Sequence, residues 1–373
     1  MLSLRASVCR PDELGETERH LWSCFQGASV ELQNPFLAAA FAAAVGQVSD
    51  RARVAVIEDA GDVVGFLAYE LAGHRVGVPI GRMTNNRQAF VHHPDLAWDW
   101  ADLLHATRLD VIEFGDLVVG QCDDRRSIEM VDAPVIDTDG GWDVYFGAMR
   151  RHKRVRTTLY KERRMRREVG EITVECGAGA CADLAALIDW KARQYRRAGW
   201  PNLLAKPWVP ALLELLAGTK TDELRAAGSS LRVDGRVVAT DLSLVSDSVF
   251  AGWFGAYDPA YAPYSPGAVH TLHVLRAAFE SGVSVVDLHR GDEEYKHLFK
   301  TGDVAVGGGY VSLPSARALA YRMRRAPSAS TRAYVLRHPN VRSYVRRSLR
   351  RAGSAREGLA RWTGRGAPES ADT

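Results

Sequence analysis

Residues 287–296 concentrate side chains that could transfer protons or bind anions. The segment reads Asp-Leu-His-Arg-Gly-Asp-Glu-Glu-Tyr-Lys and begins inside a strand predicted over residues 283–288. In open α/β sheets, ligands bind beyond the carboxyl ends of the strands. We therefore expect the polar side chains from Asp287 onward to lie at a ligand site. Taken alone, however, such a segment is more often a charged surface turn.

A second candidate site is Ser265-Pro266-Gly267, which precedes a helix predicted over residues 268–281. The first turn of a helix carries unpaired backbone N–H groups, and these groups bind anions. Ser265 is of a type that caps helices, and Gly267 would let a ligand approach the backbone closely. The segment predicts an anion site, although by itself it also fits an ordinary helix start.

The elements around these segments predict an α/β protein in which the same order of helices and strands occurs twice. Apolar periodicity and turn residues give the order helix, helix, hairpin, strand, helix, strand over residues 17–114 and again over residues 183–288. We therefore expect two tandem domains, each a mixed sheet flanked by helices. The predicted domains are residues 1–145 and 146–313, followed by an arginine-rich, helical to disordered tail over residues 314–373.

Charge separates this tail from the rest of the chain. Residues 317–365 contain fourteen arginines, and Glu357 is their single acid, whereas the remainder of the chain is acidic. Three interpretations of the tail stay open. It is a solvated extension, a peripheral contact with acidic phospholipid at the inner membrane surface, or a surface for RNA phosphates.

Composition indicates a globular protein of a reducing compartment. The chain has 373 residues, of which 46% are hydrophobic and 25% charged, and this length suits two domains. Its five cysteines form no C-x-x-C pair, and His92-His93 lacks the spacing of metal ligands, so neither disulfides nor a metal site are predicted. Neither a secretory signal nor a membrane span is apparent, and we expect a cytoplasmic protein.

The order of motifs in residues 256–300 closely resembles the GNAT-type acetyltransferase domain of proteins associated with bacterial cellulose biosynthesis. The motifs are Asp258-Pro-Ala-Tyr, Ser265-Pro-Gly and Asp287-Leu-x-Arg-Gly-Asp-Glu-x-Tyr-Lys. The basic helix over residues 150–167, the segment Trp190-Lys-x-Arg-Gln-x-x-Arg-x-Gly and the hairpin over residues 231–239 are similar to that domain as well. Residues before 150 are similar more loosely, and Fem-type peptidoglycan aminoacyl transferases share the paired layout.

The resemblance implies two GNAT-like domains and transfer of an acyl group to an amine. Such a reaction needs a base, donors for the oxyanion and close positioning of the reactants. Asp292 is the candidate base, with Asp287 and Glu293 as alternates, and Tyr295 would stabilise the oxyanion or protonate the leaving group. The residues expected to bind the substrate or the acyl donor are Arg290, Lys296, Glu293, Arg154, Lys161, Ser265 and Gly267.

The acyl donor stays open, because the Arg/Gln-x-x-Gly-x-Gly/Ala loop with which GNAT enzymes hold the coenzyme A pyrophosphate is missing here. The leading hypothesis is direct transfer of an acetyl group from acetyl-CoA, a cosubstrate rather than a resident cofactor, to a small or cell-envelope amine. One alternative is a Fem-type transferase that uses aminoacyl-tRNA, which the basic helix and tail favour. The other is a GNAT-fold binding protein without catalysis, against which the polar cluster at 287–296 argues.

Overall fold

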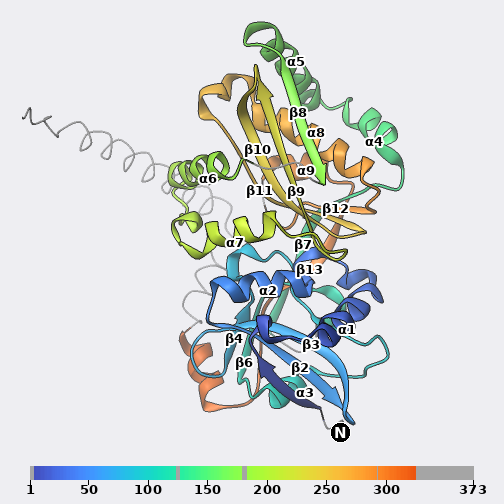
Figure 1. Ribbon diagram of the computed structural model, residues 1–373, viewed down its shortest axis with the longest axis vertical. Coiled ribbons are helices and arrows are strands. Elements are labelled where there is room, and N and C mark those ends of the chain that lie inside the picture. The colour runs from blue at the N-terminus through green and yellow to red at the C-terminus, as the bar shows by residue number, and fades with distance from the viewer. Residues whose placement is uncertain (1–3, 123–126, 179–182, 292, 325–373) are drawn as a thin grey trace, which may run out of the picture.

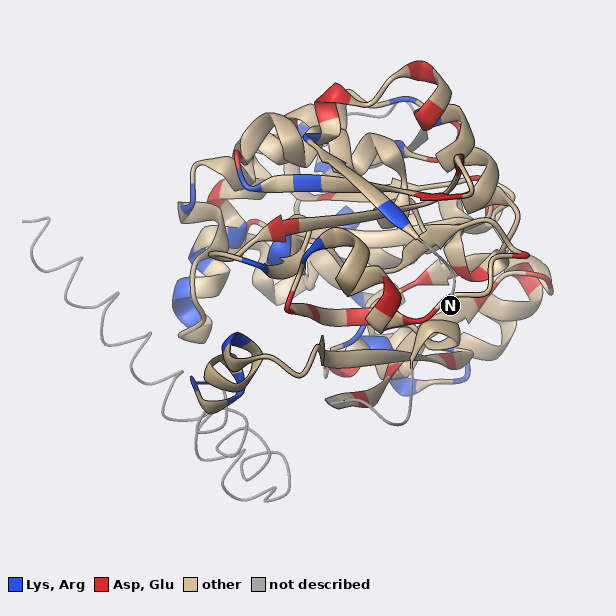
Figure 2. Cartoon of the chain, turned by 90° about the horizontal axis from the view of Figure 1, so that it is seen from below, with Lys and Arg blue, Asp and Glu red and all other residues tan. Residues whose placement is uncertain are grey.

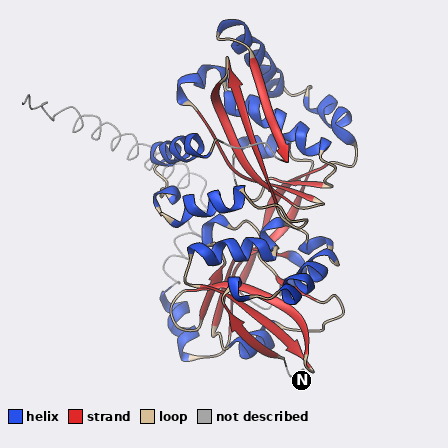
Figure 3. Ribbon diagram, viewed as in Figure 1, coloured by secondary structure: helices blue, strands red, loops and turns tan. Residues whose placement is uncertain are grey.

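The computed structural model describes residues 4–122, 127–178, 183–291 and 293–324. Figure 1 shows two α/β halves, one above the other, joined by a sheet that runs through both. In the described part of the chain this sheet has 13 strands, and helices cover both of its faces (Figure 3). The α/β class predicted from the sequence, with mixed sheets flanked by helices, is therefore confirmed.

The first half follows the predicted order of elements. Asn34 accepts a hydrogen bond from the Phe36 backbone N–H, with Pro35 in the first turn, so Asn34 caps this turn. Its helices and strands, in chain order, are β1 (Arg5–Cys9), α1 (Glu16–Gly27), η3 (Pro35–Leu37), α2 (Ala39–Val48), β2 (Ala52–Asp59), β3 (Asp62–Leu71), β4 (Val76–Pro79), η4 (Arg82–Thr84), β5 (Phe90–His92), α3 (Trp100–Thr107), β6 (Val111–Val118) and β7 (Ser127–Asp137).

The second half repeats this order after two connecting helices. The elements are α4 (Gly141–Met149), α5 (Lys153–Glu168), β8 (Ile172–Ala178), α6 (Leu184–Ala198), α7 (Trp208–Ala217), β9 (Arg225–Val233), β10 (Arg236–Val245), β11 (Val249–Tyr257), η7 (Pro259–Tyr264), α8 (Pro266–Glu280), β12 (Val285–Asp287), α9 (Glu294–Phe299) and β13 (Gly302–Ser312). The basic helix expected over residues 150–167 is α5, which begins at Lys153. The chain leaves helical geometry at His152, whose extended backbone caps α5, so α4 and α5 are separate helices.

The two halves exchange their last strands. The sheet runs β1-β2-β3-β4-β6-β13 and then β7-β12-β11-β10-β9-β8, so each half is completed by the final strand of the other. At the centre, β13 pairs antiparallel with β7, from Gly302 opposite Val135 to Gly309 opposite Ile128. Neither β7 nor β13 stood out in the sequence. The predicted boundary between residues 145 and 146 stays a prediction, but the sheet is not divided there.

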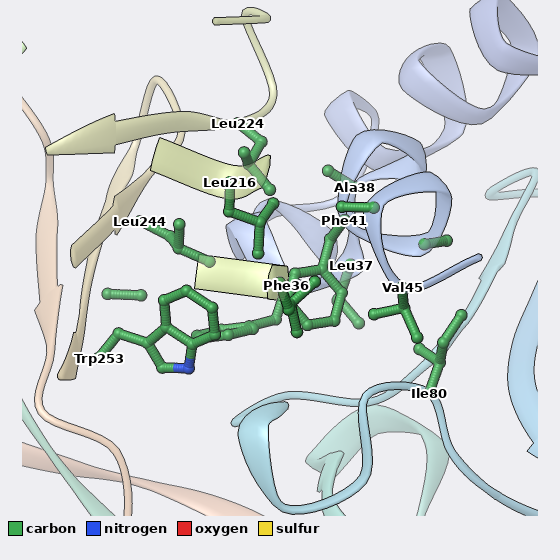
Figure 4. Packing of buried hydrophobic residues seen from close by; sticks show 14 of the residues in the cluster. Phe36, Leu37, Ala38, Phe41, Val45, Ile80, Leu216, Leu224, Leu244 and Trp253 are labelled. Atoms are coloured by element: carbon green, nitrogen blue, oxygen red, sulfur yellow. The ribbon is translucent and has the colours of Figure 1, made fainter. Parts of the chain in front are cut away.

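A shared hydrophobic core joins the halves where α2 packs beside α7 (Figure 4). Phe36 and Phe41 of the first half lie in edge contact with the Trp253 ring, at centroid distances of 5.8 and 6.5 Å. The Trp253 indole N–H also donates to the Thr84 carbonyl, at 2.7 Å. A buried side chain of this size contributes roughly 1.5–3 kcal/mol, so the halves stabilise each other directly.

The two faces of the second half are covered by different helices. Leu187 of α6 packs in one cluster with Leu242 and Phe254, whereas Val269 of α8 packs in another with Leu231 and Ala239. Successive side chains of a strand point to opposite faces, so α6 and α8 lie on opposite sides of β9, β10 and β11. The elements that carry the candidate site are thereby fixed from both sides.

Candidate active site

The parallel strands β11 and β12 diverge at the point where the candidate residues begin. They pair from Val249 opposite Val285 to Ala251 opposite Asp287, where β12 ends, while β11 continues to Tyr257. Within the described residues, no strand pairs with β11 on this side beyond Ala251. Backbone groups along that edge, which we call the open edge of β11 (residues 252–257), must find other partners. A ligand or side chains of the protein can supply them.

Asp287, at the end of β12, is a buried junction between the halves. Its carboxylate forms an ion pair with Arg87 and accepts hydrogen bonds from the Asn34 amide, at 2.9 Å, and the His289 backbone N–H, at 2.7 Å. Burial by itself would raise the pKa of Asp287, but the Arg87 guanidinium outweighs it and the pKa lies below its usual value. With both oxygens engaged, Asp287 is held as a charged anchor.

Lys296 is enclosed rather than open to a substrate. The residue is 1% exposed, and its ammonium contacts the His289 ring at 3.2 Å, the carbonyls of His289 and Arg290, and Glu293 at 3.2 Å. Burial lowers the pKa of Lys296, and Glu293 opposes that shift. These partners make Lys296 an internal support of the loop that follows β12.

Arg290 points to the first half, where its Nε lies 3.0 Å from the Asp116 carboxylate. Burial raises the pKa of Asp116, with the Arg290 charge opposing the rise. The same loop holds His289 at a φ of 44°, an unusual backbone angle for a residue with a side chain. Arg290, like Asp287, therefore connects the loop to the first half.

The predicted base Asp292 lies outside the described residues. Its neighbour Glu293 exposes 43% of its side chain. Burial alone would raise the pKa of Glu293, but Lys296 outweighs this and the pKa is lowered. Tyr295 is 44% exposed, and burial of its phenol, followed by the charges of Glu293 and Asp241, raises its pKa. Glu293 and Tyr295 are thus the two predicted catalytic groups of this segment whose side chains are partly exposed.

The predicted anion site at the start of α8 is partly occupied by the protein itself. Ser265 has a φ of 51° and makes no side-chain cap; instead its hydroxyl accepts a hydrogen bond from Lys161, at 2.7 Å. A Cβ at position 267 would lie 3.0 Å from the Tyr257 ring, so Gly267 accommodates that ring. Arg154 forms an ion pair with Glu294 at the start of α9. The basic helix α5 therefore does reach both predicted segments.

Sequence reasoning missed a polar row that crosses four strands of the second half. Cys176 of β8 lies opposite Ser229 of β9, Ser229 opposite Asp241 of β10, and Asp241 opposite Gly255 of β11. The signal available in the sequence was Asp241 itself, a charged residue inside the apolar strand Val-Val-Ala-Thr-Asp-Leu-Ser-Leu-Val. Burying a charged group costs free energy, so a charged residue in such a strand indicates a specific role.

Asp241 and Lys191 converge on the open edge of β11. The Lys191 ammonium donates to the Gly255 carbonyl, at 3.0 Å, and the Ser243 hydroxyl donates to the Asp241 carboxylate, at 2.6 Å. Burial raises the pKa of Asp241 to about 6, against the opposing effects of Ser243 and Lys191. Burial also lowers the pKa of Lys191, against the charges of Asp241 and Glu293. A carboxyl group that titrates near neutrality can exchange protons with a substrate.

Residues 153–297 match the family model of the acetyltransferase (GNAT) domain. The matched segment runs from the start of α5 to the middle of α9 and includes both β11 and β12. The prediction that the chain is an acyltransferase is confirmed at the level of this domain. No curated protein matches the sequence. Among the described residues, no three His, Cys, Asp or Glu side chains gather as metal ligands, and no helix is long and apolar enough to cross a membrane.

Several solved structures are similar over most of the chain at low identity. L-PGS from Bacillus licheniformis is 13% identical, with a TM-score of 0.47, over 86% of this chain and 99% of that one. A tandem GNAT protein from the clavulanic acid biosynthesis pathway is 11% identical, with a TM-score of 0.45, over 84% and 99%. FemX is 12% identical, with a TM-score of 0.46, over 69% and 87%.

Proposed function

We propose that the protein is an N-acyltransferase that transfers an acyl group, most simply acetyl, from acyl-CoA to an amine. The observation that carries the proposal is the divergence of β11 and β12 inside the matched acetyltransferase domain, with ionisable side chains gathered at the open edge of β11. Backbone groups of a free strand edge suit an extended amide-containing donor. Carboxylates beside that edge suit an amine that must lose a proton.

In this proposal the amine attacks the thioester carbonyl directly. The C–N bond forms as the C–S bond breaks, and the coenzyme A thiol leaves with one proton, while a carboxylate takes the proton of the incoming ammonium. The candidate base from the sequence, Asp292, is one of the groups proposed to act in this reaction, and Glu293 and Tyr295 are the others. Backbone N–H groups or the Tyr295 phenol would stabilise the oxyanion. The proposal also includes a cytoplasmic location and a small or envelope-related amine as the acceptor.

Acetyl-CoA binding tests the proposal first. Purified protein is titrated with acetyl-CoA by calorimetry and by thermal shift, and thiol release is then followed with a panel of primary amines. We expect stabilisation by acetyl-CoA and amine-dependent thiol release. Desulfo-coenzyme A and inorganic pyrophosphate serve as controls that separate recognition of the whole donor from binding of its phosphates. Absence of both stabilisation and thiol release would reject the acyl-CoA form of the proposal.

Aminoacyl-tRNA is the second candidate donor, and α5 favours it. This helix carries eight basic and two acidic residues, and Arg154 and Lys161 connect it to the site. Over the described chain as a whole, acidic and basic positions are interspersed (Figure 2), so α5 is a local concentration of positive charge. Phosphate backbones bind such surfaces in a strongly salt-dependent manner. RNA that copurifies with the protein and is released by salt, without a response to acetyl-CoA, would select this donor.

A further inference from the structure

The open edge of β11 carries a cluster that joins two residues of the predicted site, Glu293 and Tyr295, to three that the prediction did not include. We call it the Asp241 cluster; it consists of Asp241 of β10, Lys191 and Tyr195 of α6, and Glu293 and Tyr295 at the start of α9. The side chains come from three separate regions of the chain that only the tertiary structure brings together. Asp241, Lys191, Tyr195 and Glu293 are half-buried, and Tyr295 is 44% exposed. The cluster is therefore reachable from outside.

The members of the cluster interact in a closed ring. The Lys191 ammonium lies 5.6 Å from the centre of the Tyr195 ring and feels the charges of Asp241 and Glu293. Glu293 in turn acts on both Tyr195 and Tyr295, and Asp241 acts on Tyr295. Glu293 is already paired with Lys296, which leaves the Asp241 carboxylate, beside Lys191 and the Tyr195 ring, as the acidic group that an amine substrate could contact.

Gly255 allows Asp241 to reach the strand edge. The two residues lie opposite each other on β10 and β11, and a Cβ at Gly255 would lie only 2.8 Å from the Asp241 carboxylate. The missing side chain leaves that carboxylate directly over the β11 backbone. On the same residue, the Gly255 carbonyl accepts the Lys191 hydrogen bond. Lys191 is thus bonded to Gly255, and the Asp241 carboxylate lies beside the same residue, on the strand edge at which the proposed function places the acyl donor.

We infer that Asp241 is the proton acceptor for the amine in the transfer reaction, and that Lys191 is a positioning residue that holds it at the edge of β11. This inference rests on the proposed function. The substrate ammonium gives one proton to the Asp241 carboxylate, and its nitrogen then attacks the thioester carbonyl. As the C–S bond breaks, the nitrogen gives its second proton to the departing thiolate. Protonated Asp241 returns its proton to water, which restores the starting state.

Other carboxylates near the edge are less suited to this role. Asp287 has both oxygens engaged by Arg87, Asn34 and the His289 backbone. Glu293 is paired with Lys296. Asp241 has one hydroxyl partner in Ser243 and the charge of Lys191 beside it, and the other titratable groups that interact with it are Cys176 of β8 and Tyr295 of α9. No hydrogen bond from a backbone N–H to its carboxylate is present among the described residues.

Asp241→Asn tests the inference, with Asp292→Asn as its rival and Asp247→Asn as a matched control. Asp247 is exposed and pairs with Arg225 at the surface, away from the cluster. Amine-dependent thiol release from acetyl-CoA is measured from pH 5 to pH 9. We expect Asp241→Asn to lower kcat/KM by about 100-fold or more, the usual contribution of a general base, and to remove a limb near pH 6. Asp247→Asn is expected to match the wild type.

Thermal stability separates a catalytic role from a structural one. A carboxylate kept charged against its surroundings destabilises the folded state above its folded pKa, and this effect disappears below its unfolded pKa. Asp241→Asn should therefore raise Tm at pH 8 and leave it nearly unchanged at pH 4. A structural role predicts a lower Tm at pH 8 instead.

The results of these experiments distinguish a failure of the Asp241 inference from a failure of the proposed function. An active wild type together with an equally active Asp241→Asn variant overturns the inference alone, as does a loss of activity confined to Asp292→Asn. A lower Tm of Asp241→Asn at pH 8 also overturns it, because lost activity would then reflect misfolding. A wild type that releases no thiol with acetyl-CoA and any amine rejects the proposed function, and the inference with it.

Discussion

Arg87 and Asp287, 200 positions apart in the sequence, form a buried ion pair between the two halves of the protein. Arg87 lies after η4 in the first half, and Asp287 is the last residue of β12 in the second. Asn34 of the first half donates to the same carboxylate, at 2.9 Å. The end of the strand from which the candidate site begins is thus positioned by the other half of the chain.

Removing one member of this pair should destabilise the whole fold. Arg87→Ala leaves the Asp287 charge buried without its main partner, which typically costs about 3–5 kcal/mol. Urea unfolding at pH 7.5 measures the loss. Because the pKa of Asp287 is lowered in the folded state, the stability from this pair is present above the unfolded pKa of an aspartate, near 4, and disappears as the pH falls. The defect of Arg87→Ala should therefore shrink in acid.

The exposed pair of Arg225 and Asp247 is the control for that experiment. Its aspartate side chain is 76% exposed, and exposed pairs contribute little. Arg225→Ala should change the urea midpoint only slightly. If Arg87→Ala changed it no more than Arg225→Ala, the buried pair would not be the link between the halves that we describe.

Trp253→Ala should test whether the halves unfold as one unit. The substitution removes a ring packed against Phe36 and Phe41 and leaves the Thr84 carbonyl without its donor. Truncations of this size in a core cost about 3–5 kcal/mol. We expect one cooperative transition at lower denaturant, seen equally by fluorescence and circular dichroism. Two separated transitions would show that each half is stable alone.

The strand exchange predicts that removing residues 302–373 prevents folding. This truncation deletes β13, which lies between β6 of the first half and β7, and so exposes the edges of both. A second truncation that removes only residues 325–373 keeps every described strand and should fold. Solubility and circular dichroism of the two proteins provide the comparison. A folded, monomeric product of the longer truncation would contradict the exchange.

Two substitutions should shift the pH dependence of transfer without removing Asp241. Both Lys191 and Ser243 hold the pKa of Asp241 below the value that burial alone would give. Lys191→Met and Ser243→Ala should therefore raise that pKa, and the acidic limb of kcat/KM should move upward from about pH 6. A limb that stays in place in both variants would mean that Asp241 does not set it. The pH profile of thiol release is the measurement.

The local elements of this protein could be predicted from the pattern of its residues alone. Apolar periodicity identified α1, α6, α8 and the hairpins β2–β3 and β9–β10, because these depend on residues close in the chain. The resemblance of residues 150–300 likewise pointed to the acetyltransferase domain that the family model matches over residues 153–297.

Features that depend on contacts between distant residues became visible in the three-dimensional structure. The exchange of β7 and β13 depends on pairing between strands that are far apart in the sequence. Gly302, for example, lies opposite Val135. Such pairing leaves no pattern in the residues near either strand. Burial also determined the roles of individual charged residues. Lys296 and Asp287 became internal supports because charged partners surround them. Asp241, a charged residue inside an apolar strand, has a pKa raised to about 6 because the folded structure buries its carboxyl group.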